Sequence, residues 1–213
     1  MLNKFSFLAL WDNMSAKAFA SMGFIMKETI KQIIASVNYH LAVKNINGRA
    51  VLRNHKGSVM RCQKAAELGH AKAQNELGQL HEEGKHVTKD SLLAAHWYAK
   101  AASQGNALAQ YNLGCCYCNG DGVAMDRQQA TDWLELAARN GLLKAQQILG
   151  RWYSQGIYVE VDLVKAYAWF AVIGASGNDL YASHCEVMAE RMSPEMLKEA
   201  KVLGRRYVSI SKC

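Results

Sequence analysis

The chain has 213 residues, of which 50% are hydrophobic and 20% charged, and its formal net charge is +7 at pH 7. This length allows one continuous hydrophobic core. The single proline favours a nearly all-helical protein, because proline breaks helix interiors. No run reaches the ~20 consecutive apolar residues of a membrane-spanning helix, which excludes that class of anchor.

Residues 1–18 carry the least information. Lys4 and the apolar run from Phe5 to Trp11 resemble a secretory signal, but the run is short and Asp12 interrupts it. A cleaved signal is therefore not the favoured interpretation. An organelle transit peptide is not favoured either, because lysine outnumbers arginine in this acid-poor region.

Residues 1–34 are assigned as an amphipathic and basic N-terminal segment, and residues 19–41 are predicted to form its helix. The apolar positions of this helix step by three and four, at Phe19, Met22, Met26, Ile30, Ile33, Val37 and Leu41. We expect the helix to cover the first full repeat as a cap. A membrane-surface helix is the alternative, which three lysines support, Lys17, Lys27 and Lys31.

Residues 35–70 are predicted to form a degenerate repeat, because they match the segment that follows at an offset of 36 residues. The matching positions are Leu41, Gly48, Val51, Asn54, Ala65, Ala66 and Gly69. Arg61 stands where the later units have a tryptophan. Such incomplete units are common at the ends of solenoids.

Residues 71–178 contain three copies of one unit, assigned to 71–106, 107–142 and 143–178. The same offset of 36 residues relates Leu77, Leu113 and Leu149, Asp90, Asp126 and Asp162, and Trp97, Trp133 and Trp169. A fixed period of this size indicates a solenoid, in which each unit buries its apolar face against its neighbours.

The middle unit predicts two helices joined by a tight turn. Apolar and small residues favour a helix from Ala107 to Asn119, which Gly120 ends because glycine adopts the left-handed conformation without a Cβ penalty. Asp126 is predicted to be the N-cap of the second helix, and Gln129 to complete a capping box.

The run A-x-A-x-x-x-L-G-x-x-Y-x-x-G-x-G-V-x-x-D-x-x-x-A-x-x-W, followed by an Ala-Ala pair and Gly, resembles the Sel-one-like repeat (SLR), a relative of the tetratricopeptide repeat. The resemblance covers residues 71–177 and implies an all-α fold, a right-handed α-α superhelix. The sequence departs from it at His86 and Tyr158, which replace the second loop glycine, and at His81, which replaces the tyrosine of the first helix.

Residues 179–213 are predicted to form two capping helices. The last helix is expected from about Pro194 to Val208, with Ser193 as its N-cap. The apolar residues of the helix before it step by four, three and four, at Tyr181, Cys185, Met188 and Met192.

The charge is distributed unevenly. Residues 1–64 hold ten Lys or Arg and two acidic residues, a net charge of +8, whereas residues 65–213 carry −1. Such asymmetry can attract anionic lipid, nucleic acid or an acidic partner. No nucleic-acid-binding motif accompanies the charge, which disfavours nucleic acid. A solvated basic face is the preferred interpretation, with a membrane surface or an anionic polymer as the alternative partner.

No catalytic or metal-binding motif is present. The six cysteines do not follow the repeat period, so reduced thiols in a cytoplasmic protein are expected, with a periplasmic or secreted protein as the alternative. Cys115 and Cys118 could supply two metal ligands, but a structural zinc site needs four. His81 to His86 fails as H-E-x-x-H because the second histidine is one residue too distant. We therefore predict no metal, no cofactor and no enzyme; a hydrolase is the alternative and would need a titratable cluster in one pocket.

The remaining candidate is a surface. In the tetratricopeptide fold the first helices line the concave face, and the resemblance implies the same lining here. The implied residues are Lys72, Asn75, Gln79, Glu82, Leu108, Tyr111, Cys115, Cys118, Lys144, Gln147, Arg151 and Ser154. Their mixed polar and aromatic character suits a peptide or a partner helix. The resemblance thus implies an adaptor or regulator, often bacterial, that binds a protein partner.

Overall fold

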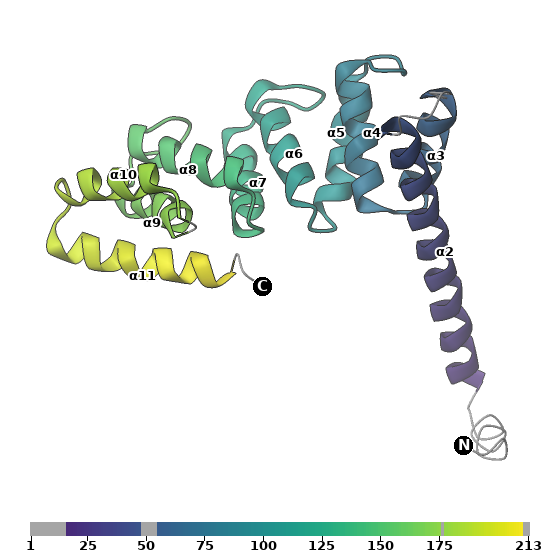
Figure 1. Cartoon of the computed structure of the whole chain (residues 1–213), viewed down its shortest axis with the longest axis horizontal. Coiled ribbons are helices and arrows are strands. Elements are labelled where there is room, and N and C mark those ends of the chain that lie inside the picture. Colours follow the sequence, from purple (N-terminus) through teal and green to yellow (C-terminus); the bar gives the residue numbers. More distant parts are fainter. Residues whose placement is uncertain (1–15, 48–54, 176, 211–213) are drawn as a thin grey trace. The chain divides into compact units, whose positions relative to one another are not determined.

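The computed structural model describes residues 16–47, 55–175 and 177–210. These residues form ten helices, α2 to α11, and no strand (Figure 1). The chain divides into two compact units, residues 1–70 and 71–213. The signal-like run at 5–11 and the repeat matches at Gly48, Val51 and Asn54 lie outside the described residues.

The described part of the first unit consists of α2 (Ala16–Asn47) and α3 (His55–Glu67), which pack on each other. The boundary assigned between residues 34 and 35 falls inside α2. Among the α2 side chains whose burial is described, Ala35 and Ala42 are the buried ones, at 0% and 1% exposed. The apolar stripe predicted to act as a packing surface is instead 39–58% exposed at its described positions, Met26, Ile30, Ile33, Val37 and Leu41.

The second unit begins with three helix pairs, which Figure 1 shows in succession. In each pair the two helices pack together, and the second helix also packs on the first helix of the next pair. This arrangement confirms the predicted all-α solenoid. The pairs are α4 (Ala71–Glu83) with α5 (Ser91–Ala102), α6 (Ala107–Asn119) with α7 (Arg127–Arg139), and α8 (Leu143–Gln155) with α9 (Leu163–Gly174).

A glycine in each first helix allows the two helices of a pair to approach closely. A Cβ on Gly78 would lie 2.6 Å from the Tyr98 ring, and a Cβ on Gly150 would lie 2.4 Å from the Phe170 ring. No side chain can occupy these positions without moving the opposite ring. The leucine beside each glycine is at most 2% exposed, at Leu77, Leu113 and Leu149.

In each of these three pairs, the loop between the paired helices ends at an aspartate that caps the second helix. The Asp126 side chain accepts hydrogen bonds from the backbone N–H groups of Gln128 and Gln129, at 2.9 and 3.0 Å, which confirms the predicted N-cap. The capping box is wrong, because the Asp126 N–H donates to the carbonyl of Tyr117 at 3.0 Å. The backbone of the preceding helix thus takes the place of the Gln129 side chain, and the loop is tied at both ends.

Two loops adopt a left-handed backbone without glycine. Gly122 has φ 72°, and the equivalent His86 and Tyr158 have φ 63° and 61°. The departures from the repeat pattern therefore leave the path of the loop unchanged. A left-handed residue other than glycine costs on the order of 1 kcal/mol or more, so these loops store backbone strain.

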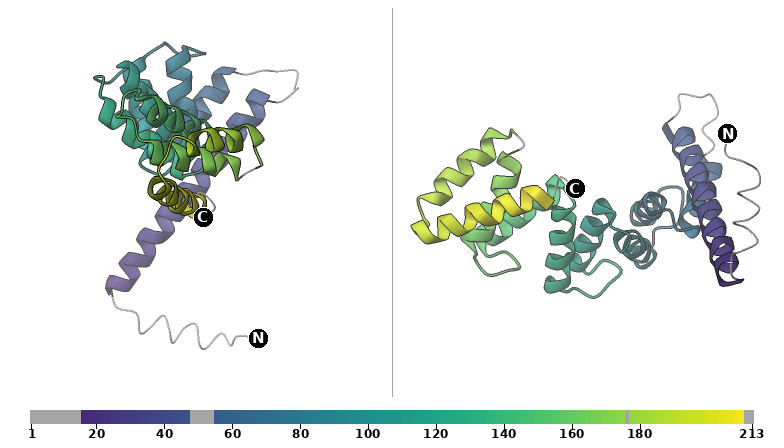
Figure 2. Two further views of the ribbon diagram at one scale, coloured as in Figure 1. Left: turned by 90° about the vertical axis from the view of Figure 1, so that its left-hand side faces the viewer. Right: turned by 90° about the horizontal axis from the view of Figure 1, so that it is seen from below.

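The last two helices are α10 (Asp179–Ala189) and α11 (Pro194–Ile210). The Ser193 hydroxyl accepts a hydrogen bond from the Met196 N–H at 3.2 Å, as expected of an N-cap. The α11 helix packs on α9, and Figure 2 shows it, in yellow, running along the green helices. Tyr207 stacks on Trp169 with ring centroids 4.1 Å apart, so α11 covers the last repeat.

The strain at His86 predicts a stabilising substitution. His86→Gly should raise the free energy of unfolding by about 1 kcal/mol, less any contribution from the side chain's own contacts. Tyr158→Gly should gain less, because it also removes ring contacts with Trp152, at 4.7 Å, and Arg127, at 5.5 Å. Urea unfolding measures both, and a destabilised His86→Gly variant would contradict the prediction.

Gly122→Ala provides the opposite test. Its Cβ would lie 2.0 Å from the carbonyl oxygen of Ser91, in addition to the left-handed backbone penalty. Gly105→Ala is the matched control, since Gly105 has φ 83° but no atom within 4 Å of a Cβ. We expect Gly105→Ala to cost about 1 kcal/mol and Gly122→Ala at least about twice that. Equal losses would show that the contact with Ser91 does not constrain the loop.

Candidate functional site

A pocket of about 540 Å³ opens between α8 and α10, and we call it the α8–α10 pocket. Three residues of the predicted concave lining open into it from α8: Gln147, Arg151 and Ser154. Its most buried lining residues are Phe170 of α9 and Met188 of α10, 8% and 6% exposed. Polar side chains of one helix therefore border an apolar floor supplied by two others.

An aromatic cluster forms one side of this pocket. The Phe170 ring centroid lies 5.6 Å from that of Tyr181 and 5.6 Å from that of His184, with His184 stacked at 29°. Gly150 leaves the space that the Phe170 ring occupies. The position of the aromatic cluster thus follows from the same close approach that builds the repeat.

The α8–α10 pocket is basic. Arg151 and Arg191 line it, and no acidic residue does so among those described. The ion pairs in the described part of the chain are Lys31–Glu28, Arg139–Glu135 and Lys165–Asp162, so neither arginine belongs to one. Both guanidinium groups therefore keep their hydrogen-bond donors available for an anionic group.

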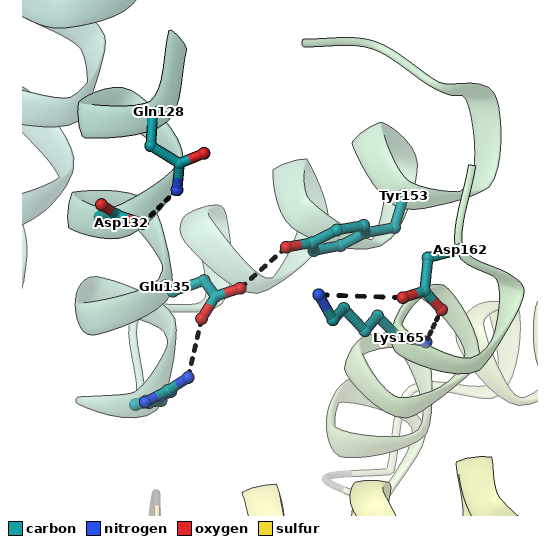
Figure 3. Close-up of polar contacts among 7 residues, drawn as sticks. Gln128, Asp132, Glu135, Tyr153, Asp162 and Lys165 are labelled. Atoms are coloured by element: carbon teal, nitrogen blue, oxygen red, sulfur yellow. Dashed lines mark hydrogen bonds and ion pairs between the residues drawn. The ribbon is translucent and has the colours of Figure 1, made fainter. Parts of the chain in front are cut away.

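A second pocket, of about 850 Å³, lies between α7 and α9 and is lined by four acidic residues, Asp132, Glu135, Glu160 and Asp162. Figure 3 shows its polar contacts. Glu135 accepts a hydrogen bond from the Tyr153 hydroxyl at 2.8 Å and from Arg139 at 2.7 Å. Burial, together with the Glu135 carboxylate, raises the pKa of Tyr153, which keeps this hydroxyl a donor.

The other carboxylates of this larger pocket are also engaged. Asp132 accepts a hydrogen bond from Gln128 at 2.8 Å, and Asp162 caps α9 and lies 3.8 Å from the Lys165 ammonium group. Three of the four acids therefore hold helices and loops together. The α8–α10 pocket, with two unpaired cations, is the better candidate for binding a ligand.

Of the eight predicted lining residues on α4 and α6, one, Asn75, is buried and three, Lys72, Glu82 and Leu108, are exposed. Asn75 is 3% exposed, and its Oδ1 accepts a hydrogen bond from Asn112 at 3.0 Å, so it is not available to a partner. Glu82 accepts a hydrogen bond from the Tyr98 hydroxyl at 2.6 Å. Tyr111 and Cys118 are partly buried against the core around α8 and α9.

Lys72 and Leu108 are exposed, whereas Gln79 and Cys115 are partly buried. Lys144 of α8 is exposed but does not line the α8–α10 pocket.

The contribution of α10 to the pocket was not predicted. The sequence pattern predicted only a capping role for this helix, and neither Phe170 nor the α10 side chains were predicted as site residues. A signal was present, because several pocket residues step by three or four along one helical face, at Tyr181, His184, Val187, Met188 and Arg191.

Burial raises the thiol pKa of four described cysteines, Cys115, Cys116, Cys118 and Cys185. Burial raises the pKa of Cys116 to about 12 and the pKa values of Cys118 and Cys185 to about 11. The thiol, not the reactive thiolate, therefore predominates at neutral pH. In the described part of the chain, no group of three His, Cys, Asp or Glu side chains is arranged to hold a metal ion.

Comparison with protein families gives a match to the Sel1 repeat at residues 38–70, 71–106, 107–142 and 143–175. The chain belongs to the Sel1-repeat family. The first of these matches overlaps the degenerate unit predicted at residues 35–70. Sel1 repeats generally mediate protein–protein interactions, and the proteins that contain them are typically non-enzymatic scaffolds.

The solved structures that resemble this Sel1-repeat chain include two from bacteria. The first is c5321, a protective antigen of uropathogenic Escherichia coli strains with an SLR fold, at 32% identity and a TM-score of 0.69. The match covers 83% of this chain but only 38% of c5321. The second is a Sel1 repeat protein from Oxalobacter formigenes, at 35% identity and a TM-score of 0.54, covering 60% of this chain and 98% of that one. Comparison with curated proteins finds no match.

The raised thiol pKa values predict slow alkylation. With a pKa of about 11, Cys118 should carry on the order of 100-fold less thiolate than an ordinary cysteine at about pH 8. Its reaction with iodoacetamide should accelerate as the pH rises towards that value. Peptide-resolved mass spectrometry measures the rate for each cysteine, with the urea-unfolded chain as control. Equal rates for Cys118 in the folded and unfolded chains would contradict this expectation.

Proposed function

We propose that this Sel1-repeat protein is a non-enzymatic adaptor or regulator that binds a protein partner along its first helices α4, α6 and α8. The partner would engage the exposed positions of these helices and end in the α8–α10 pocket. One observation carries the proposal: Gln147, Arg151 and Ser154 open into the same pocket as the apolar floor of Phe170 and Met188. A surface that combines apolar anchors with polar groups suits a protein segment.

Two further observations support a binding role over a catalytic one. Three of the four carboxylates in the larger α7–α9 pocket are engaged in structural hydrogen bonds or ion pairs. The buried thiols have raised pKa values, which opposes nucleophilic chemistry at neutral pH. A binding surface requires neither group to be reactive.

Site-specific photo-crosslinking tests the proposed face. Benzoylphenylalanine in place of Gln147 should give a discrete cross-linked partner in the protein's native cells, because this position lines the pocket. The same group in place of Glu199, an exposed residue of α11, is the control. Immunoblotting followed by mass spectrometry detects the product. Cross-linking from the Glu199 position alone, or from neither position, would contradict the proposal.

A second function, binding to an anionic membrane surface through α2, is favoured by a separate observation. The exposed stripe from Met26 to Leu41 lies opposite the buried Ala35 and Ala42. Lys27 borders the stripe, and Lys31, paired with Glu28, lies between the stripe and the buried face. An apolar face flanked by lysines suits a helix that lies in the plane of a bilayer surface. Among the described helices, none has the length and apolarity to cross the bilayer.

Vesicle flotation tests this second function. The intact chain should bind vesicles containing phosphatidylglycerol and should bind less at about 500 mM salt than at about 50 mM, because salt screens the lysines. Ile33→Asp should weaken binding on the order of 10-fold, since it removes an apolar side chain from the stripe. Thr29→Asp adds the same charge outside the stripe and should have a smaller effect. Equal losses in the two variants would count against insertion of the stripe.

A further inference from the structure

The α8–α10 pocket combines an apolar floor with a basic rim. Its position on the proposed binding face does not require this combination. Its floor is apolar, with Phe170 8% and Met188 6% exposed. Its rim carries Arg151 from α8 and Arg191 from the turn after α10. A ligand that fills it therefore needs an apolar group and an anionic group close together.

The charge of the rim is not balanced within the chain. The described part of the chain provides neither arginine with an ion pair, and no described acidic residue lines the pocket. The α7–α9 pocket has the opposite character, because its Lys165 and the nearby Arg139 are already paired with Asp162 and Glu135. The α8–α10 pocket thus presents two guanidinium groups that lack a carboxylate, whereas the pocket of about 490 Å³ beside α11 presents one, Arg205, whose Nε donates to the carbonyl of Lys201 at 3.2 Å.

The pocket is also large enough to admit one large side chain. The volume of about 540 Å³ falls within the range of ligand pockets, roughly 300–1,000 Å³. The rings of Phe170, Tyr181 and His184 are fixed against one another at centroid distances of 5.6 Å. An inserted aromatic or long aliphatic side chain would therefore meet a preformed surface, which lowers the entropic cost of binding.

We propose that the α8–α10 pocket binds an acidic peptide segment of the partner, with one large apolar side chain on the floor and a carboxylate on each side held by Arg151 and Arg191. Guanidinium groups bind carboxylates through strong, charge-assisted hydrogen bonds. The inference rests on the proposed function and specifies the chemistry of the partner at one end of that face.

Fluorescence polarisation with the full-length chain tests this ligand class. The probe is the fluorescein-labelled peptide Ser-Asp-Glu-Phe-Glu-Asp-Ser, which should bind saturably. Replacing its acids by Asn and Gln, or its Phe by Ser, should each weaken binding on the order of 10-fold or more. Equal binding of the Asn/Gln peptide would overturn the role of the carboxylates, and equal binding of the Ser peptide would overturn the role of the floor.

Matched charge variants locate the site. Arg151→Gln and Arg191→Gln should each weaken the probe on the order of 10-fold. Arg206→Gln removes the same charge from α11, outside the pocket, and should change binding less than about 2-fold. Circular dichroism verifies that each variant is folded. An equal loss with Arg206→Gln would show non-specific attraction and overturn the proposal.

The outcome also separates this inference from the function on which it rests. If the probe fails to bind while the cross-linker at Gln147 still captures a partner, the acidic ligand class is wrong and the binding face stands. If neither the probe nor the cross-linker gives a product, both the ligand class and the proposed face are wrong.

Discussion

Each repeat depends on one close contact between a glycine of its first helix and a large side chain of its second. Gly78, Gly114 and Gly150 lie opposite Tyr98, Leu134 and Phe170, and a Cβ on Gly114 would lie 2.9 Å from the Leu134 Cγ. The contact sets how far apart the paired helices lie. Each unit of a solenoid packs mainly on its neighbours, so the geometry of one pair also sets the position of the next. The aromatic side of the α8–α10 pocket is a consequence, since Phe170 lies in the space that Gly150 leaves.

A buried glutamine then holds successive repeats in register. The Gln110 side chain, 4% exposed, donates to the carbonyl of Ala102 at 3.2 Å and accepts a hydrogen bond from Asn140 at 2.8 Å. Gln146 donates in the same way to the carbonyl of Ala138 at 3.0 Å. Ala102 is the last residue of α5 and Ala138 the last but one of α7, and each carbonyl also accepts a backbone N–H, that of Gly105 at 3.0 Å and that of Gly141 at 3.1 Å. A buried polar group left unpaired costs about 1–3 kcal/mol, so these bonds favour one angle between repeats over its alternatives.

The α8–α10 pocket lies at the end of the solenoid, where the 36-residue repeat pattern is no longer followed. Tyr181 and Glu186 of α10 occupy, one period on, the positions of Ala145 and Gly150 in α8. The α10 helix therefore lacks the small residues that allow a first helix to approach closely. It packs on α9 and leaves a pocket with an apolar floor and two unpaired arginines beside α8. The end of the solenoid thus supplies a recess beside α8 that is bordered by arginines, unlike the α7–α9 pocket, which is lined by acidic residues.

The sequence by itself determined the repeat unit, the order of its helices and the aspartate N-caps, because these follow from local backbone chemistry and the spacing of small residues. It also placed Gln147, Arg151 and Ser154 on one helix face. Tertiary structure decided the rest. Asn75 is buried because Asn112 of the next repeat bonds to it, and the α2 stripe is exposed because burial falls on Ala35 and Ala42. The pocket needed α10 to be placed beside α8. Each of these features depends on which residues of different helices come into contact. Helical periodicity predicts which residues share a face of one helix, but it does not predict the distances between helices.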